Sequence, residues 1–181
     1  EAGNLFGLGL LLAATMFGLT LGRVCRDVVL LDTLGKEWLP PLYIISTLFI
    51  IMAALTYSHL VRKVHPRLLG PLMSWLMALL LVGCWLMLRL EVPYAAAPLY
   101  VAVQLVWMLS LMLFWNLATE IVEPQLAKRL FPMLSICALS AMMLAGSGAL
   151  LLSQRMGASQ LILIWCVLLA ASSPLVRRLV L

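Results

Sequence analysis

The chain has 181 residues, of which 65% are hydrophobic and only 10% are charged, and its formal net charge is +5. Soluble domains carry roughly 45–50% apolar and about 25% charged residues. A soluble fold of this length could not bury the excess, so the composition predicts an integral membrane protein with lipid around most side chains. Basic residues of membrane proteins concentrate in cytoplasmic loops, and no basic stripe is interleaved with exposed aromatics. We therefore expect no nucleic-acid partner.

Apolar runs long enough to cross a bilayer follow one another along the chain. A spanning helix needs about 20 residues at a rise of about 1.5 Å per residue. The first run extends from Leu5 to Gly22 and continues toward Leu31. Short connections and the lack of any polar segment indicate a single transmembrane domain over 1–181, all-α, with about six helices. The expected spans are 5–31, 39–60, 68–88, 98–121, 130–152 and 160–176.

Basic residues near the span ends predict the orientation, because cytoplasmic ends carry the excess of Lys and Arg. One side collects Arg62, Lys63, Arg67, Lys128, Arg129, Arg177 and Arg178. The other side has Lys36, Arg89 and Arg155, offset by Asp32, Glu37 and Glu91. We therefore expect both termini in the cytoplasm. The first residues, Glu1 to Asn4, include neither an initiator Met nor a basic region, so we expect no signal peptide and interpret both ends as cut from a longer polypeptide.

The first candidate for chemistry is the charged stretch that holds Arg23, Arg26 and Asp27. Ionisable groups inside a span are costly and mark functional sites by default. If the first helix continues, Arg26 follows Gly22 by one turn and points into the bundle, and Arg23 can pair with Asp27 along the helix. Alternatively, the helix ends at Gly22 and the arginines reach the outer interface.

The second candidate is Asn116 with Glu120, one helical turn apart in the fourth run, with Gln104 further up the same helix. An amide and a carboxylate inside a bundle could bind a cation, take up a proton or orient a polar substrate. Alternatively, Glu120 and Glu123 already lie in the cytoplasmic interface before Pro124.

Spans one and four are thus the two with candidate buried charges. In a unit of two three-helix repeats these helices are equivalent, and we expect them to face a shared cavity, as in secondary transporters. Small residues at four-residue intervals predict helix contact surfaces. They are Ala14, Gly18 and Gly22 in the first run, and Ala141, Ala145 and Ala149 in the fifth, with Gly146 and Gly148 alongside.

Other chemistry is not indicated by the sequence. The four cysteines (Cys25, Cys84, Cys137 and Cys166) are widely spaced, and His59 and His65 flank a basic loop without forming a ligand pair. No phosphate-binding glycine loop, Ser/His/Asp grouping or pair of catalytic carboxylates is present. We expect no enzyme activity, no cofactor and no metal site.

Two stretches resemble the bacterial and plastid ATP/ADP carrier family, nucleotide antiporters related to the major facilitator superfamily. Residues 26–40, RDVVLLDTLGKEWLP, resemble the family's basic-Asp pattern after the first helix and its Pro-led second helix. Residues 114–120, FWNLATE, with 127–132, AKRLFP, are similar to its fourth helix and the loop that follows. Arg26 stands where the family often has Lys, and residues 57–63 are at best a degenerate version of the facilitator loop.

The resemblance implies a facilitator-like N-terminal half-bundle in a bacterial inner membrane. It implies that Arg26 and Glu120 occupy positions used for charged substrate. Arg26 would then bind a nucleotide or another organic anion, and Asn116 and Glu120 would form a gate that controls access to it. Because such carriers have about twelve spans with the substrate between two halves, a second half-bundle or partner subunit is also implied. The alternative is a non-transporting anchor or accessory subunit of a larger membrane complex.

Overall fold

The computed structural model describes residues 2–64, 66–122, 124–157 and 160–180, and these ranges contain helices and no strand. The expected all-α architecture is confirmed, and the long apolar helices make the chain an integral membrane protein. The helices are α1 (Ala2–Thr33), the short η1 (Lys36–Trp38), α2 (Leu39–Lys63), α3 (Pro66–Arg89), α4 (Ala96–Ile121), α5 (Pro124–Met156) and α6 (Gln160–Val180).

Helix α1 is continuous through the charged stretch, so the longer of the two alternatives for the first span is the correct one. The helix stops where Gly35 adopts a φ of 78°, a left-handed conformation that glycine takes without steric cost. The backbone N–H groups of Leu34 and Gly35 both donate to the Leu30 carbonyl and so close the end of the helix. Prolines follow at the start of α2, where no intrahelical donor is needed.

Within the described ranges, five apolar segments are long enough to span a membrane, and a sixth is shorter. The spans are Gly7–Thr33, Lys36–Lys63, Leu68–Arg89, Ala96–Glu120 and Leu130–Ser153, and the shorter apolar segment is Gln160–Pro174. Helix α5 begins six residues before the expected span at 130, because Pro124 opens a helix that runs on into the apolar segment.

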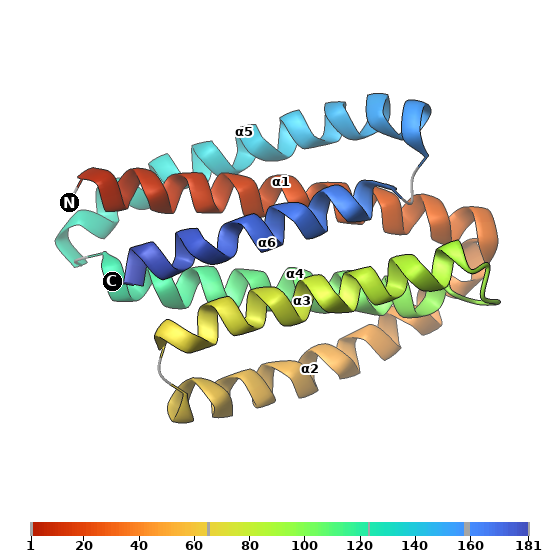
Figure 1. The fold of residues 1–181 in the computed structure, drawn as a ribbon, viewed down its shortest axis with the longest axis horizontal. Coiled ribbons are helices and arrows are strands. Elements are labelled where there is room, and N and C mark those ends of the chain that lie inside the picture. The colour runs from red at the N-terminus through yellow and green to blue at the C-terminus, as the bar shows by residue number, and fades with distance from the viewer. Residues whose placement is uncertain (1, 65, 123, 158–159, 181) are drawn as a thin grey trace.

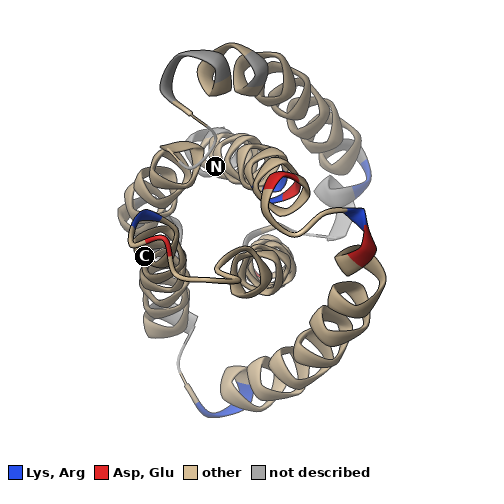
Figure 2. Ribbon diagram, turned by 90° about the vertical axis from the view of Figure 1, so that its right-hand side faces the viewer, with Lys and Arg blue, Asp and Glu red and all other residues tan. Residues whose placement is uncertain are grey.

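The helices pack in a pattern that repeats between the two halves of the chain. Helix α1 contacts α4, α5 and α6, while α4 contacts α1, α2 and α3, and α3 packs closely on α6. Exchanging α1, α2 and α3 for α4, α5 and α6 leaves these principal contacts unchanged, as expected for two three-helix repeats. Figures 1 and 2 show α2 and α5 at opposite edges of the bundle, with α3 and α6 together on one side of the α1–α4 pair.

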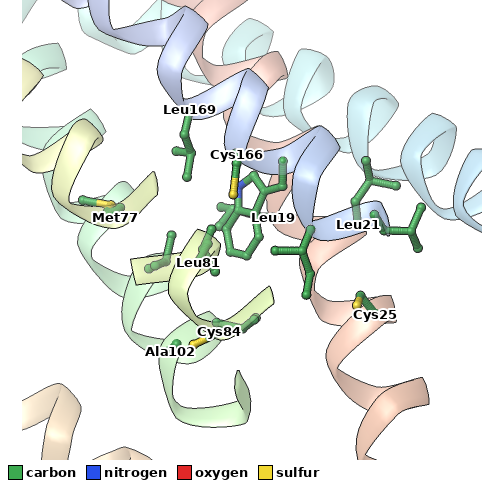
Figure 3. Packing of buried hydrophobic residues seen from close by; sticks show 14 of the residues in the cluster. Leu19, Leu21, Cys25, Met77, Leu81, Cys84, Ala102, Cys166 and Leu169 are labelled. Carbon is green, nitrogen blue, oxygen red and sulfur yellow. The ribbon is translucent and has the colours of Figure 1, made fainter. Parts of the chain in front are cut away.

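The largest buried cluster joins α1, α3, α4 and α6, with Ala149 of α5 added to it (Figure 3). At its centre lies Trp165 of α6, whose side chain is 0% exposed. Its indole ring lies directly against Gly18 and Gly22 of α1, where a β-carbon would overlap the ring. The predicted small-residue stripe of the first span is therefore a helix contact surface, and in α5 Ala145 is likewise buried. By contrast, nothing lies within 4 Å of the position a β-carbon would take at Gly146 or Gly148.

Large apolar side chains cover the outer surfaces of α2, α3 and α5, where lipid is the solvent. The two ends of the chain lie at the same end of the bundle (Figure 1). Arg62 and Lys63 in the last turn of α2 lie at that end, and Arg89 in the last turn of α3 lies at the other. The placement of the termini in the cytoplasm stays a prediction. Some residues named in the sequence analysis lie outside the described residues or side chains. They are His65, Arg67, Glu123, Arg129, Arg155, Arg177 and Arg178.

Candidate functional site

Arg26 is held by partners from two helices. Its Nε and Nη2 atoms each lie 2.8 Å from Oδ1 of Asp27, and Nη1 donates to Oε1 of Gln104 on α4 at 2.8 Å. The guanidinium also lies over the Tyr100 ring, 4.4 Å from its centroid. The Arg26 side chain is 12% exposed and that of Asp27 is 52% exposed. Arg26 therefore points toward α4 as a compensated charge that joins α1 to α4.

Arg23 lies one turn earlier on α1 and is half-buried. Its guanidinium carbon is 4.3 Å from the centroid of the Trp107 ring on α4, a cation–π contact. Within the described residues no acceptor or carboxylate lies in hydrogen-bond or ion-pair range of Arg23. The predicted Arg23–Asp27 ion pair is not made; Oδ1 of Asp27 binds Arg26 instead, and Asp27 acts on Arg23 only at longer range. Arg23 is therefore a cation whose N–H donors are available.

Both arginines belong to the interior of a span rather than to its end. The middle residue of the segment Gly7–Thr33 is Thr20. At about 1.5 Å per residue, Arg23 lies about 5 Å and Arg26 about 9 Å from that midpoint along the helix. The hydrocarbon half-thickness is about 15 Å, so both charges fall within hydrocarbon depth when the span is centred in the bilayer.

Asn116 and Glu120 lie on a different part of α4. Asn116 lines a groove between α2 and α4 together with Tyr57, Ser58, Arg62 and Thr119. The Tyr57 hydroxyl is buried and close to Asn116, but no partner completes a hydrogen bond with it. Glu120 is exposed near the end of α4, as the interfacial alternative for this residue requires.

The two candidate groups do not meet. Helices α1 and α4 pack side by side, and Arg26 reaches α4 at Gln104. Asn116 and Glu120 follow Gln104 by 12 and 16 residues, which is about 18 and 24 Å along the helix axis. The two groups thus lie toward opposite ends of the bundle, and Arg26 and Glu120 cannot contact one small anion at the same time in this conformation.

Three aromatic partners were not singled out as site residues from the sequence. Tyr100 and Trp107 share a face of α4 with Gln104, at spacings of four and three residues. That spacing was a usable signal, because side chains three and four apart are neighbours on a helix. Tyr57 had no comparable signal, since it is one of many apolar or aromatic residues on α2. Comparisons with protein-family models, curated proteins and solved structures gave no match to this chain.

Proposed function

We propose that this chain is one half of a facilitator-type carrier for nucleotides or other organic anions, and that Arg23 is the principal anion-binding residue. The observation that carries the proposal is an arginine within a span that has no hydrogen-bonded counter-charge among the described residues. An unpaired guanidinium at this depth is costly, and such a group is retained where it binds a charged ligand. Its planar fork of donors matches phosphate and carboxylate oxygens.

Arg26 has a supporting role in this proposal. Arg23, Arg26 and Asp27 together carry one excess positive charge, since the single carboxylate compensates one of the two arginines. The contacts of Arg26 with Gln104 and Asp27 hold that charge in place one turn from Arg23. An anion bound at Arg23 therefore meets a site with one net positive charge, beside an Arg26–Asp27 pair that is held in place.

Asn116 and Glu120 belong to a gate at the other end of the bundle in this proposal. Alternating access would come from rocking against a second half-bundle, supplied by the rest of a longer polypeptide or by a partner subunit. The repeated packing of α1, α2 and α3 on α4, α5 and α6 supports such a half. Location in a bacterial inner membrane with cytoplasmic termini belongs to the same proposal.

Uptake of a radiolabelled nucleotide into liposomes containing the full-length polypeptide tests the proposal. We expect Arg23→Ala to reduce uptake at least about 30-fold, because losing one partner of a buried charge pair costs roughly 2–5 kcal/mol. Arg89→Ala is the matched control, since Arg89 also lies over a tryptophan, Trp85 at 5.3 Å, but is exposed at the end of α3. Equal uptake by the two variants, both correctly inserted, would refute the role given to Arg23.

A second candidate function is a membrane anchor or accessory subunit without transport. The observation that favours it is that Arg26 is fully engaged within its own bundle, as a structural residue would be. The intact mass of the polypeptide purified from its own membrane separates the two. A mass near 20.0 kDa with a co-purifying membrane partner favours the subunit, whereas twice that mass or more favours the carrier.

A further inference from the structure

We propose that the groove between α2 and α4 binds an anionic phospholipid, with its phosphate at Arg62 and an acyl chain along the apolar wall. The groove has a volume of about 730 Å³, within the range of ligand pockets. Its lining residues belong to the C-terminal halves of α2 and α4. These two helices end at the end of the bundle that holds both chain ends (Figure 1). This site is separate from Arg23 and does not depend on the transport proposal.

The polar end of the groove contains a cation without a counter-charge. Arg62 lies in the last turn of α2, is exposed, and has no ion-pair or hydrogen-bond partner among the residues that the structure describes. Lys63 follows it and adds a second positive charge at the same depth. Glu120 of α4 does not line the groove, although its carboxylate is close enough to act on Tyr57 and is not paired with Arg62. Each Lys or Arg near a membrane surface attracts anionic headgroups by about 1 kcal/mol, so this pair favours such a lipid.

The same groove is lined by a buried tyrosine whose hydroxyl is poorly satisfied within the described residues. Tyr57 is 7% exposed, and its buried hydroxyl lies beside the Asn116 side chain without completing a hydrogen bond of good geometry. Leaving a buried hydroxyl unpaired is costly, so an acceptor supplied by a ligand stabilises the site. Tyr57 precedes Arg62 by five residues, about 7.5 Å along the helix toward the middle of the span. A glycerol ester carbonyl lies at that depth below a phosphate bound by Arg62.

The remaining wall is apolar and follows the same direction into the membrane. The lining residues further from the polar end are Ala54, Met108, Leu111 and Met112. A free phosphate or a soluble anion makes no use of such a wall, whereas an acyl chain fills it. Helix α2 is poorly buried by its own protein, with large exposed side chains such as Leu55 at 68%, so lipid has direct access to the groove. From the end of α2 inward, the groove thus presents a polar end, a buried hydroxyl and an apolar wall. This is the order of the phosphate, the ester groups and the acyl chain in a phospholipid.

Native mass spectrometry of the full-length polypeptide in a neutral detergent tests this site with dioleoyl-phosphatidylglycerol and dioleoyl-phosphatidylcholine as probes. We expect tighter binding of the first phosphatidylglycerol, weakened about tenfold in Arg62→Gln through loss of a charge-assisted contact. Lys63→Gln is the matched control, because Lys63 has the same charge and depth but does not line the groove; we expect less than about a twofold change. Equal affinities of these two variants would overturn the proposal.

Two more variants distinguish a bound phospholipid from a free anion held at Arg62. Tyr57→Phe removes only the unpaired hydroxyl, and we expect weaker phosphatidylglycerol binding at an unchanged melting temperature. Ala54→Trp fills the apolar wall, and we expect it to block the lipid while leaving Arg62 in place. If inorganic phosphate displaces the lipid, or if Ala54→Trp binds lipid as the unmodified protein does, the site is not a phospholipid site.

Discussion

Replacing Gly18 by Ala tests the packing at the centre of the bundle. A β-carbon at Gly18 would overlap Cδ1 of Trp165 and lie 2.9 Å from Nε1 and 3.3 Å from Cγ of the same ring. Trp165 cannot move aside easily, because its side chain is 0% exposed within the cluster shared by α1, α3, α4 and α6. We therefore expect the added methyl group to force α1 and α6 apart.

The magnitude follows from two opposing effects. Adding a methyl group to a filled core costs typically about 1–3 kcal/mol, whereas Ala stabilises a helix by up to about 1 kcal/mol relative to Gly. Gly146→Ala isolates the second effect, since nothing lies within 4 Å of its β-carbon position on α5. The difference between the two variants is therefore about 1–3 kcal/mol, or roughly 2–12 °C in melting temperature for a domain of this size.

Thermal unfolding of the two variants in the same detergent measures this difference directly. We expect Gly18→Ala to melt below Gly146→Ala, and the smaller side chain of Trp165→Leu to relieve the clash in the double variant. The relief would be a non-additive coupling of about 0.5–3 kcal/mol between Gly18 and Trp165. If Gly18→Ala melts together with Gly146→Ala, the close contact between α1 and α6 is wrong.

Gln104→Leu is expected to lower the free energy of unfolding by about 1–3 kcal/mol, because the Arg26 guanidinium loses the acceptor at 2.8 Å; an unchanged melting temperature would mean that Asp27 and Tyr100 suffice to hold Arg26. N-ethylmaleimide applied to the folded protein in detergent is expected to modify at most Cys137, and slowly, since Cys137 is exposed to detergent within a span and the other three are buried. Intact-mass measurement counts the adducts, and a second adduct before unfolding would contradict the burial of Cys25, Cys84 and Cys166.

The sequence predicted the helices well because lipid selects them by simple criteria. A run of about 20 apolar residues is sufficient to define a span. The helix ends were predicted less well: Pro66 and Pro124 open α3 and α5 two and six residues before the expected spans, and Gly35 closes α1. The stripe through Gly18 and Gly22 also predicted a contact surface, because small residues are what allow helices to approach closely in lipid.

The candidate site was predicted less completely. Arg23, Arg26 and Asp27 were correctly placed on a continuous helix, but the sequence suggested an Arg23–Asp27 pair where the structure pairs Asp27 with Arg26. Asn116 and Glu120 share a helix face as expected, but they lie far from the arginines along α4. A spacing rule describes neighbours on one helix and contains no information about where another helix lies.

Composition and apolar run length alone therefore determine that this chain is a membrane-embedded bundle of helices. Only the tertiary structure decides that Arg26 meets Gln104 and Tyr100, while Arg23 lies over Trp107 with its N–H donors available. In a soluble protein the polar face of a helix indicates which side faces the solvent. In this chain the lipid and the protein core are both apolar, so the pattern of apolar residues does not indicate how each helix is rotated about its axis. The rotation and register of α1 against α4 depend on close packing between residues far apart in the chain.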